Sequence, residues 1–351
     1  MKSIHVQVSK PYDVLIARGI LDEAGSRIAA ALGHSRAMIV TDDTVDALYA
    51  ARLEKSLADA GMAAEKFVIP HGEASKNMRT LTALLEALAE AAFSRGDILI
   101  ALGGGVVGDL TGFAAATFLR GVRYVGIPTT VLACVDSSVG GKTAVDLDAG
   151  KNLAGAFWHP SMVLCDPDTL STLAPEVRAD GFAEIIKYGM IGDAALFDML
   201  HHPDTMDMEE IIARCVQAKA DIVEQDELDN GLRKLLNYGH TAGHAIEANS
   251  DFSIMHGHGV AMGMMIAAKY AAGRGLCPAD LPAKQEALIR LYNLPTQSPY
   301  PPEILFASTT RDKKRMKNKI DIVIPKQIGE CVLLRLDIAE LKEYLSEGCT
   351  K

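Results

Sequence analysis

Four of the ten histidines fall within a short stretch of the second half of the chain, where they could bind a metal ion. His240 and His244 are four residues apart in NYGHTAGHAIEA, so on a helix their rings lie on one face. His256 and His258 follow at the start of another apolar segment. Two imidazoles, one carboxylate and an open position form the ligand set with which a zinc ion polarises a substrate oxygen. We therefore predict a divalent metal site that uses at least two of these four histidines.

The missing ligand of such a site should be a carboxylate. Glu184 in GFAEIIKYG is the best candidate, because it is an acid on an otherwise apolar segment and Lys187 shares its face one turn later, although composition alone does not select it. The alternative is that the histidines cap helices or satisfy hydrogen bonds in a mixed core, which is the commoner role of a single histidine. Their clustering favours the metal site.

A glycine-rich segment nearer the N-terminus could bind a dinucleotide. The run DILIALGGGVVGD places Gly103, Gly105 and Gly108 in the pattern G-x-G-x-x-G, after a predicted strand and before a predicted helix. Backbone amides without neighbouring side chains and a helix N-terminus can hold a pyrophosphate there. The sequence thus predicts nucleotide chemistry and metal chemistry in one chain.

A polar segment, DSSVGGKTAVDLDAGKN, runs from Asp136 to Asn152 and is predicted to be a loop. Lys142 and Lys151, with backbone amides and Asn152, would form a phosphate receptor. The alternative is a surface loop with solvated lysines. GGKT is not a P-loop, because the earlier glycine of that motif is absent at its required spacing.

The elements that must position these residues change in kind along the chain. From residue 1 to about 130, short β-rich runs such as AMIVTDD and VRYVGIPTT alternate with helical stretches, which predicts a parallel sheet covered by helices. Asp42, Glu73, Gly103–Gly105 and Thr129–Thr130 follow four of these runs, where ligands of such sheets gather. After Phe157–Gly181, a segment rich in proline and aspartate that we interpret as a crossing between domains, the pattern becomes helical.

Length and composition narrow the class of protein. A chain of 351 residues suits two domains, and we predict an α/β N-terminal domain with a Rossmann-like parallel sheet (1–172) and an all-α, metal-binding C-terminal domain (173–351). The net charge of −10 argues against nucleic acid as a partner. No apolar segment predicts a membrane anchor or export signal, and six scattered cysteines without a C-x-x-C pair indicate reduced thiols in a cytoplasmic protein.

Ten short motifs follow one another in a fixed order. They begin with GE-x-x-K (Gly72 to Lys76) and continue through GGGVVGD, FLRG, PTT, DSSVGGKT, GKNLAGAF, FAEIIKYG, DELDNGLR and LNYGHTAGHAIE to DKK. In these motifs, from about Asp42 to about Lys314, the chain resembles the 3-dehydroquinate synthases of the sugar-phosphate cyclase group. The resemblance implies a nucleotide-binding α/β half and a helical metal-binding half, usually in a homodimer.

The resemblance also implies a role for individual residues. NAD would be bound by Asp42, Glu73, Lys76, Gly104, Gly105, Val106, Asp109, Thr129, Thr130, Thr169 and Thr172, with Lys142 and Lys151 beside it. One zinc or cobalt ion would be held by Glu184, His240 and His256, with His244 as a polar catalytic neighbour. The sugar-phosphate substrate would contact Asp136, Lys142, Lys151, Asn152, Lys187, Lys219, Arg233, Asn237 and one of Lys313 and Lys314, with Arg120 reaching in from the partner subunit.

The reaction that the resemblance implies converts 3-deoxy-D-arabino-heptulosonate 7-phosphate to 3-dehydroquinate and phosphate, in the shikimate pathway to aromatic amino acids. Oxidation by NAD acidifies a neighbouring C–H so that phosphate leaves, and re-reduction and an intramolecular aldol closure follow. Two other enzymes remain as alternatives: a sister cyclase for another sugar phosphate, and an iron-type polyol dehydrogenase, which would release NADH. A catalytically silent scaffold would have lost ligands or pocket lysines, and all are present.

Three motifs depart from the family pattern. HGHG replaces HGEA, so His258 stands where an acid is frequent, and KTAVD replaces KTGVN at Ala144 and Asp146. Asp229 stands where glutamate is usual, and it keeps the charge but reaches one methylene less far. His258 could compete as a metal ligand. We rank His256 ahead of it because its place in the motif agrees with the family.

Overall fold

The computed structural model describes residues 1–251, 253–310 and 319–349. The chain packs as two compact units, of which unit 1 comprises Met1–Leu173 and Met208–Leu228, and unit 2 comprises Ala174–Asp207 and Asp229–Lys351. The sequence-based boundary assigned residues 208–228 to the helical half, whereas they pack with the sheet of unit 1. No helix within the described residues is long and apolar enough to span a membrane.

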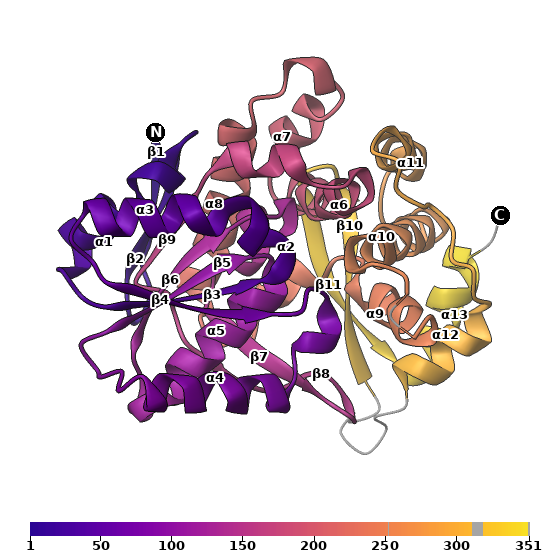
Figure 1. Cartoon of the computed structure of the whole chain (residues 1–351). Helices are drawn as coiled ribbons and strands as arrows, with labels where there is room; N and C mark the ends of the chain where they lie inside the picture. The colour runs from indigo at the N-terminus through magenta and orange to yellow at the C-terminus, as the bar shows by residue number, and fades with distance from the viewer. Residues whose placement is uncertain (252, 311–318, 350–351) are drawn as a thin grey trace. The chain divides into compact units, whose positions relative to one another are not determined.

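Unit 1 is built on a sheet with the strand order β1-β2-β9-β6-β5-β3-β4 (Figure 1). Its first two strands pair antiparallel and all other neighbours pair parallel. The strands are β1 (Lys2–Val6), β2 (Tyr12–Ile16), β3 (Ala37–Asp42), β4 (Ala64–Ile69), β5 (Ile98–Gly103), β6 (Arg123–Pro128) and β9 (Met162–Cys165). The helices are α1 (Ala24–Leu32), α2 (Asp43–Val45), α3 (Ala51–Asp59), α4 (Met78–Glu90), α5 (Gly105–Thr117) and α8 (Met208–Gln225). The predicted α/β unit with a mainly parallel sheet is confirmed.

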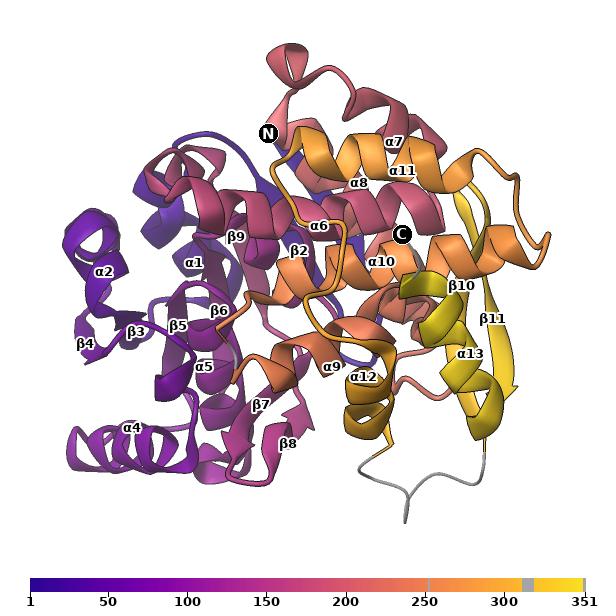
Figure 2. The ribbon, with the colours of Figure 1, turned by 90° about the vertical axis from the view of Figure 1, so that its right-hand side faces the viewer.

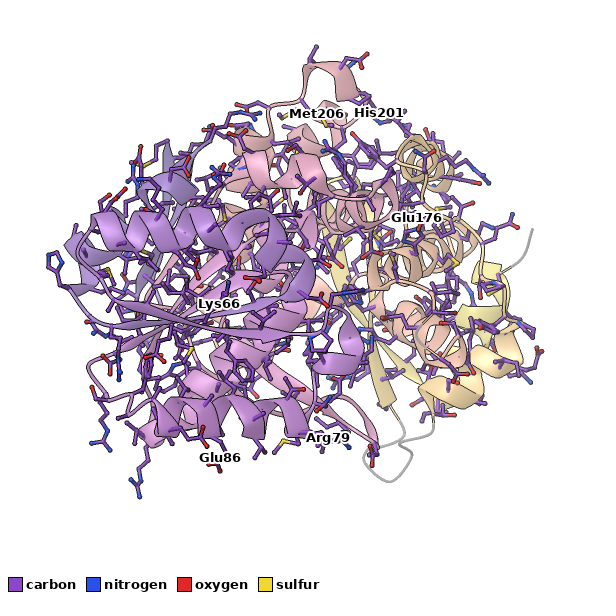
Figure 3. The ribbon with its side chains drawn as sticks, in the orientation of Figure 1. Lys66, Arg79, Glu86, Glu176, His201 and Met206 are labelled. Carbon is purple, nitrogen blue, oxygen red and sulfur yellow. The ribbon has the colours of Figure 1, made fainter. Side chains whose placement is uncertain are left out.

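Helices cover both faces of this sheet, so its central strands are buried throughout. Every residue of β5, ILIALG, is buried, as expected of a parallel strand that is covered on both faces. Its residues alternate between two cores: Ile98 and Ile100 pack on the side of α1 and α3, whereas Leu99 packs on the side of α4 and α5. On the outer face of α4, Arg79 and Glu86 point into solvent (Figure 3).

The order in which the chain adds strands reverses between β3 and β5. From β3 the chain continues to β4 at one edge, then returns to β5 on the other side of β3 and goes on to β6. Ligands of open α/β sheets bind in the crevice outside the carboxyl ends of the strands at such a switch point. Asp42 ends β3 and Gly103 ends β5, so two of the predicted nucleotide-binding segments stand at this point.

Two parts of unit 1 differ from the sequence interpretation. The segment predicted as a polar loop contains a hairpin, in which β7 (Lys142–Leu147) pairs antiparallel with β8 (Gly150–Phe157). The segment interpreted as a crossing between domains does contain the boundary between the units, at Leu173 and Ala174, but it also contains β9, which pairs with both β2 and β6. β9 has only four residues, which is too short for its pattern to distinguish a buried strand from other apolar segments.

Unit 2 is predominantly helical, as predicted. Its helices are α6 (Pro175–Ile191), α7 (Ala194–Met199), α9 (His240–Asn249), α10 (His256–Gly273), α11 (Leu281–Leu291), α12 (Pro302–Thr309) and α13 (Ile338–Cys349). Figure 2 shows α10 with α6 and α11 above it and α9 below it. α10 is apolar around most of its circumference and almost entirely buried, as expected of the central helix of a core.

A β-hairpin is the part of unit 2 that the helical prediction missed. β10 (Lys319–Gln327) pairs antiparallel with β11 (Glu330–Asp337), and Ile322–Ile324 of β10 are buried. The carboxylate of Asp321 accepts a hydrogen bond from Arg335 Nε at 2.7 Å and one from Lys234 Nζ at 2.8 Å. These hydrogen bonds hold the pKa of Asp321 well below its usual range.

Candidate functional site

Close packing of α9 against α10 brings the clustered histidines together. A Cβ atom on Gly263 would lie 1.9 Å from the carbonyl oxygen of Gly239, and one on Gly243 would lie 3.0 Å from the backbone of α10. Glycine therefore permits a backbone approach that any side chain would prevent. His240 and His256 are the first residues of the two helices, and their ring centroids lie 5.1 Å apart.

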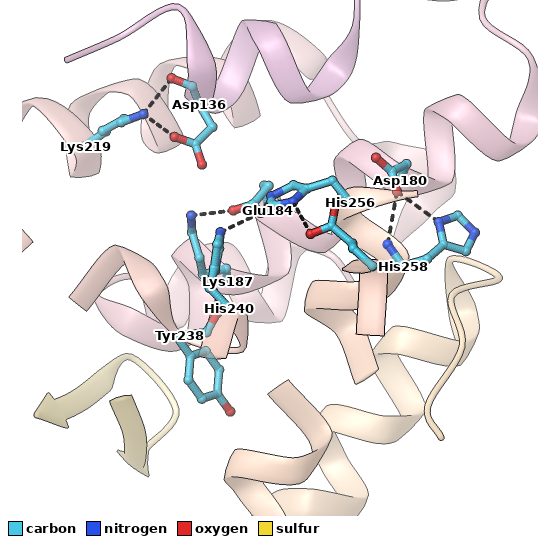
Figure 4. Close-up of polar contacts among 10 residues, drawn as sticks. Asp136, Asp180, Glu184, Lys187, Lys219, Tyr238, His240, His256 and His258 are labelled. Carbon is cyan, nitrogen blue, oxygen red and sulfur yellow. Dashed lines mark hydrogen bonds and ion pairs between the residues drawn. The ribbon is translucent and has the colours of Figure 1, made fainter. Parts of the chain in front are cut away.

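Glu184 of α6 faces both of these rings (Figure 4). Its Oε1 atom lies 3.6 Å from Nε2 of His240 and 3.3 Å from Nε2 of His256. A tetrahedral zinc ion with ligands at about 2.1 Å separates those ligands by about 3.4 Å. The Glu184 side chain is fully buried and forms an ion pair with Lys187, yet neither of its oxygens has a well-directed hydrogen bond within the described residues. The spacing and the buried carboxylate both fit a divalent metal ion.

The second nitrogen of each imidazole contacts an oxygen. Nδ1 of His240 lies 3.2 Å from the carbonyl oxygen of Tyr238, and Nδ1 of His256 lies 3.2 Å from the carboxylate of Glu247. Such partners orient a ligating histidine and leave its other nitrogen to the metal. The sequence analysis missed Glu247, which is buried. Its position three residues after His244, on the same helix face, could have indicated that it lies near the histidines.

The two imidazoles have opposite pKa shifts. Desolvation and the positive charge of Lys187 lower the pKa of His240, which keeps that ring neutral, the form that binds metals. Desolvation also acts to lower the pKa of His256, but the carboxylates of Glu184 and Glu247 beside the ring raise it to about 10. The surroundings of His256 therefore stabilise positive charge.

A second set of side chains, His244, Glu247 and His256, also has ligand atoms within 4.8 Å of one another. It shares His256 with the first set, but His244 is exposed, whereas Glu184 is fully enclosed. No metal-ligand set within the described residues includes His258. Its ring nitrogen Nδ1 contacts Asp180 on α6 at 2.9 Å instead.

The other predicted substrate residues of unit 2 lie on α6 and just before α9. Lys187 and Arg233 are each 1% exposed, and Asn237 is exposed at the end of the short 3-10 helix Leu232–Asn237. Lys313 and Lys314 lie outside the described residues.

In unit 1, the strand-to-helix turn after β5 has the features of an anion-binding site. Gly104 is the N-cap of α5 and offers no side chain, so the first amides of the helix lack the usual capping acceptor. A small cavity beside this turn is lined by residues that include Gly104, Asp109 and Lys142. Thr129, at the end of β6, has a buried hydroxyl with no hydrogen-bond partner within the described residues. These groups fit the polar parts of a dinucleotide.

Lys76 is the centre of a charged group that joins the predicted nucleotide and phosphate residues. Its Nζ atom lies 2.5 Å from Oδ2 of Asp109 and 2.6 Å from Oδ1 of Asn152. Lys151 lies 3.7 Å from Glu73, so the hairpin brings its own polar residues to this group. Desolvation acts to lower the pKa of Lys76, but Asp109 and Glu73 together raise it, so the side chain remains an ammonium.

A second buried lysine of unit 1 is Lys219 on α8. It donates a hydrogen bond to the carbonyl oxygen of Asp136 at 2.8 Å and forms an ion pair with the carboxylate of the same residue (Figure 4). Lys142 is exposed at the start of β7. Arg120 is exposed in the left-handed backbone region, with φ of 67°.

The remaining predicted NAD residues take part in contacts of the fold. The Asp42 carboxylate caps α2 by accepting hydrogen bonds from two backbone amides. The hydroxyl of Thr169 donates to a backbone carbonyl at 2.8 Å, and that of Thr172 lies 2.6 Å from the hydroxyl of Tyr49. Gly105 and Val106 open α5, and Thr130 caps the following turn by accepting from a backbone amide at 3.2 Å.

Solved structures with the same fold define the class. One is 2-epi-5-epi-valiolone synthase from Streptomyces hygroscopicus with NAD+ and Zn2+ bound, which has a TM-score of 0.86 and 29% identity over 98% of each chain. Another is 2-deoxy-scyllo-inosose synthase complexed with carbaglucose-6-phosphate, NAD+ and Co2+, with a TM-score of 0.88 and 24% identity over 99% of this chain and 100% of that one. The fold is therefore that of the sugar-phosphate cyclases.

Sequence comparison narrows this class to one family. Residues 66–179 match the family model 3-dehydroquinate synthase N-terminal, and residues 181–315 match 3-dehydroquinate synthase C-terminal. The 3-dehydroquinate synthase of Caulobacter vibrioides is 44% identical over 96% of this chain and 96% of its own. The chain belongs to the 3-dehydroquinate synthase family, which confirms the resemblance inferred from the ten motifs.

Proposed function

We propose that the chain converts 3-deoxy-D-arabino-heptulosonate 7-phosphate to 3-dehydroquinate and phosphate, using NAD and one zinc or cobalt ion. The observation that carries this proposal is the cluster of the buried Glu184 with the partly buried His240 and His256, in a chain of the 3-dehydroquinate synthase family. Because the reaction breaks a carbon–oxygen bond to phosphate, the enzyme would be a lyase, acting in the shikimate pathway.

In this proposal Glu184 and the Nε2 atoms of His240 and His256 hold the metal ion. We prefer this set to the one containing His244 because Glu184 is fully buried and its oxygens lack well-directed hydrogen bonds within the described residues. Glu247 then orients the ring of His256 through Nδ1. His244 stays exposed beside the cluster, where it can exchange a proton with the substrate.

When bound, the nucleotide would supply a reversible hydride acceptor and the divalent ion would supply a Lewis acid for a substrate oxygen. The chain's own residues bind and orient the substrate. Lys187 holds a buried ammonium next to Glu184, which places positive charge where the substrate oxygen becomes negative. Lys142, Lys151 and Asn152 bind the phosphate group, because ammonium and amide donors match its oxygens.

The nucleotide would lie at the carboxyl edge of the unit 1 sheet. The start of α5 at Gly104, Gly105 and Val106 would face the pyrophosphate, and the buried hydroxyl of Thr129 would gain a partner. The remaining NAD contacts that the family assigns are Asp42, Glu73, Lys76, Asp109, Thr130, Thr169 and Thr172.

The remaining substrate contacts also follow from the family. They are Asp136, Lys219, Arg233, Asn237 and one of Lys313 and Lys314. We propose a homodimer in which Arg120, exposed in this chain, completes the substrate site of the partner subunit.

The decisive experiment supplies the heptulosonate phosphate with zinc and a trace of NAD+, and follows inorganic phosphate together with the absorbance of reduced nicotinamide. We expect phosphate release to exceed the NAD present many times over, without lasting accumulation of NADH. One NADH per turnover without phosphate would instead identify a polyol dehydrogenase. Phosphate release from a different sugar phosphate only would identify a sister cyclase.

A further inference from the structure

The metal cluster is bordered by a second polar pair, Asp180 of α6 and His258 of α10, to which the family resemblance gives no role (Figure 4). Oδ1 of Asp180 accepts a hydrogen bond from the backbone amide of His258 at 3.0 Å and contacts ring nitrogen Nδ1 of the same residue at 2.9 Å. Only 11% of the Asp180 side chain and 22% of the His258 side chain are exposed. Both contacts thus converge on one largely buried carboxylate oxygen.

The backbone contact acts as a helix cap supplied by a neighbouring helix. The residue before α10, Met255, has extended backbone angles and no side-chain hydrogen bond to the first turn. His258 is the third residue of α10, and its amide is one that a capping oxygen usually satisfies. Asp180 takes this role from α6, and its negative charge also suits the N-terminal end of the helix.

The same contact fixes how α10 lies against α6 at the first turn. A Cβ atom on Gly257 would lie 1.9 Å from the carbonyl oxygen of Asp180, so the two backbones are in contact there. Glu184 follows Asp180 by one helical turn on the same face of α6. His256 precedes His258 by two residues. The capping contact therefore sets the position of the first turn of α10, which carries His256, relative to α6, which carries Glu184.

We propose that Asp180 and His258 form a positioning pair that holds His256 at metal-binding distance from Glu184. Without the pair, the first turn of α10 loses its cap and frays, and the separation of 3.3 Å between Oε1 of Glu184 and Nε2 of His256 is no longer maintained. The pair contributes no ligand. The inference rests on the proposed function in one respect: it takes the cluster of Glu184, His240 and His256 as the binding site of the metal ion that the reaction uses.

The test measures the affinity for cobalt and the visible absorption of the bound ion, neither of which requires substrate. We expect Asp180→Ala to weaken cobalt binding by about 10- to 100-fold, the usual effect of losing a residue that orients a ligand, and to alter the absorption of bound cobalt. Asp180→Asn keeps an oxygen acceptor of the same reach, so it should restore the affinity to within about threefold of the wild type.

Asp193→Ala is the matched control. Asp193 caps α7 in the same unit by accepting from the third amide of that helix, Leu196, at 2.9 Å. Its removal should lower the melting temperature by a few degrees, as Asp180→Ala does, but leave the cobalt affinity within about twofold of the wild type. Equal cobalt affinities for Asp180→Ala and Asp193→Ala would overturn the proposal, and so would failure of Asp180→Asn to restore binding.

A second comparison covers the case in which Asp180→Ala does not fold. His258→Gln keeps an N–H donor for Asp180, whereas His258→Ala does not, so alanine should weaken cobalt binding about fivefold more than glutamine. Equal affinities of these two variants would refute the pair's role. If the wild type binds cobalt but releases no phosphate, the proposed reaction fails while this inference stands, because its test depends on cobalt binding alone.

Discussion

Replacing Glu184 with glutamine keeps the shape of the side chain and removes its charge, which tests the metal assignment directly. The Oε1 atom of Glu184 is the one that both imidazoles approach, at 3.3 Å and 3.6 Å. Two unit charges about 4 Å apart in an effective dielectric of about 20 interact by about 4 kcal/mol, which corresponds to about a thousandfold in affinity. A divalent ion bound by the carboxylate lies closer and carries more charge, so this energy is a lower limit. We therefore expect Glu184→Gln to weaken zinc or cobalt binding by at least about three orders of magnitude.

The assay is metal content after dialysis against a buffered chelator, followed by a cobalt titration. The wild type should retain about one ion per chain, the capacity of a single three-ligand site, and the variant none. NAD binding should be unchanged in the variant, because the proposed nucleotide residues belong to unit 1. Asp321→Asn is the matched control, since it also removes a carboxylate paired with a lysine in unit 2 and should leave metal content intact.

A Glu184→Gln protein that retains stoichiometric zinc would refute the assignment. The set of His244, Glu247 and His256 would then be the candidate site. Glu247→Gln separates the two schemes further. If Glu247 only orients His256, its loss should weaken metal binding by about 10- to 100-fold, whereas loss of a ligand should have the larger effect expected of Glu184→Gln.

Three further predictions address the phosphate pocket, the helix packing and the acid stability. Lys142→Ala should raise the KM for the phosphate-bearing substrate at least about tenfold and weaken NAD binding far less, because a lysine–phosphate contact is a charge-assisted hydrogen bond. Equal losses of substrate and NAD binding would assign the hairpin a purely structural role. Gly263→Ala should lower the free energy of unfolding by about 1–3 kcal/mol, since its Cβ would lie 1.9 Å from the carbonyl oxygen of Gly239. Gly273→Ala is the control in denaturant titrations, because Gly273 lies on the same helix and the nearest atom to an added Cβ would be 3.9 Å away. This substitution should be neutral or should stabilise the fold by up to about 1 kcal/mol. Similar losses of stability in both variants would contradict the packing argument. Because the pKa of Asp321 is lower in the folded state than in the unfolded state, its carboxylate stabilises the fold. This stabilisation is fully present above the unfolded-state pKa of about 4 and is lost as the pH falls through the lower folded-state pKa. Asp321→Asn should therefore lower the free energy of unfolding by about 1 kcal/mol at pH 7, and this difference should shrink below pH 4; a difference that does not depend on pH would oppose this account.

The features that could be predicted from the sequence are those with a local cause. β5 is a continuous apolar run that ends in glycines, so both its burial on two faces and the turn after it follow from its residue types. The spacing of His240 and His244 places both rings on one face of α9, and their centroids are 5.2 Å apart. The roles of the individual site residues stay predictions until variants are measured.

The features that could not be predicted depend on contacts between segments far apart in the chain. The polar residues around Lys142 and Lys151 carry no apolar alternation, so nothing local distinguishes a hairpin from a loop. The apolar face of the helix Met208–Gln225 shows that it packs against something, but not that its partner is the sheet unit. Glu247 is an intermediate case: its place three residues after His244 puts it on the histidine face of α9, but its contact with His256 depends on another helix.

The choice between His256 and His258 shows how helix geometry resolves what a motif leaves open. The two residues are two positions apart on α10, which is about 200° around the helix, so their side chains diverge and reach different residues of α6. The contact of Gly257 with the backbone of α6 fixes how α10 is rotated at this turn. His256 then faces Glu184 at 3.3 Å, and His258 faces Asp180 at 2.9 Å. A histidine at position 258 is therefore compatible with a metal site built from His256, and in our proposal its imidazole contributes to that site by holding the first turn of α10, which carries His256.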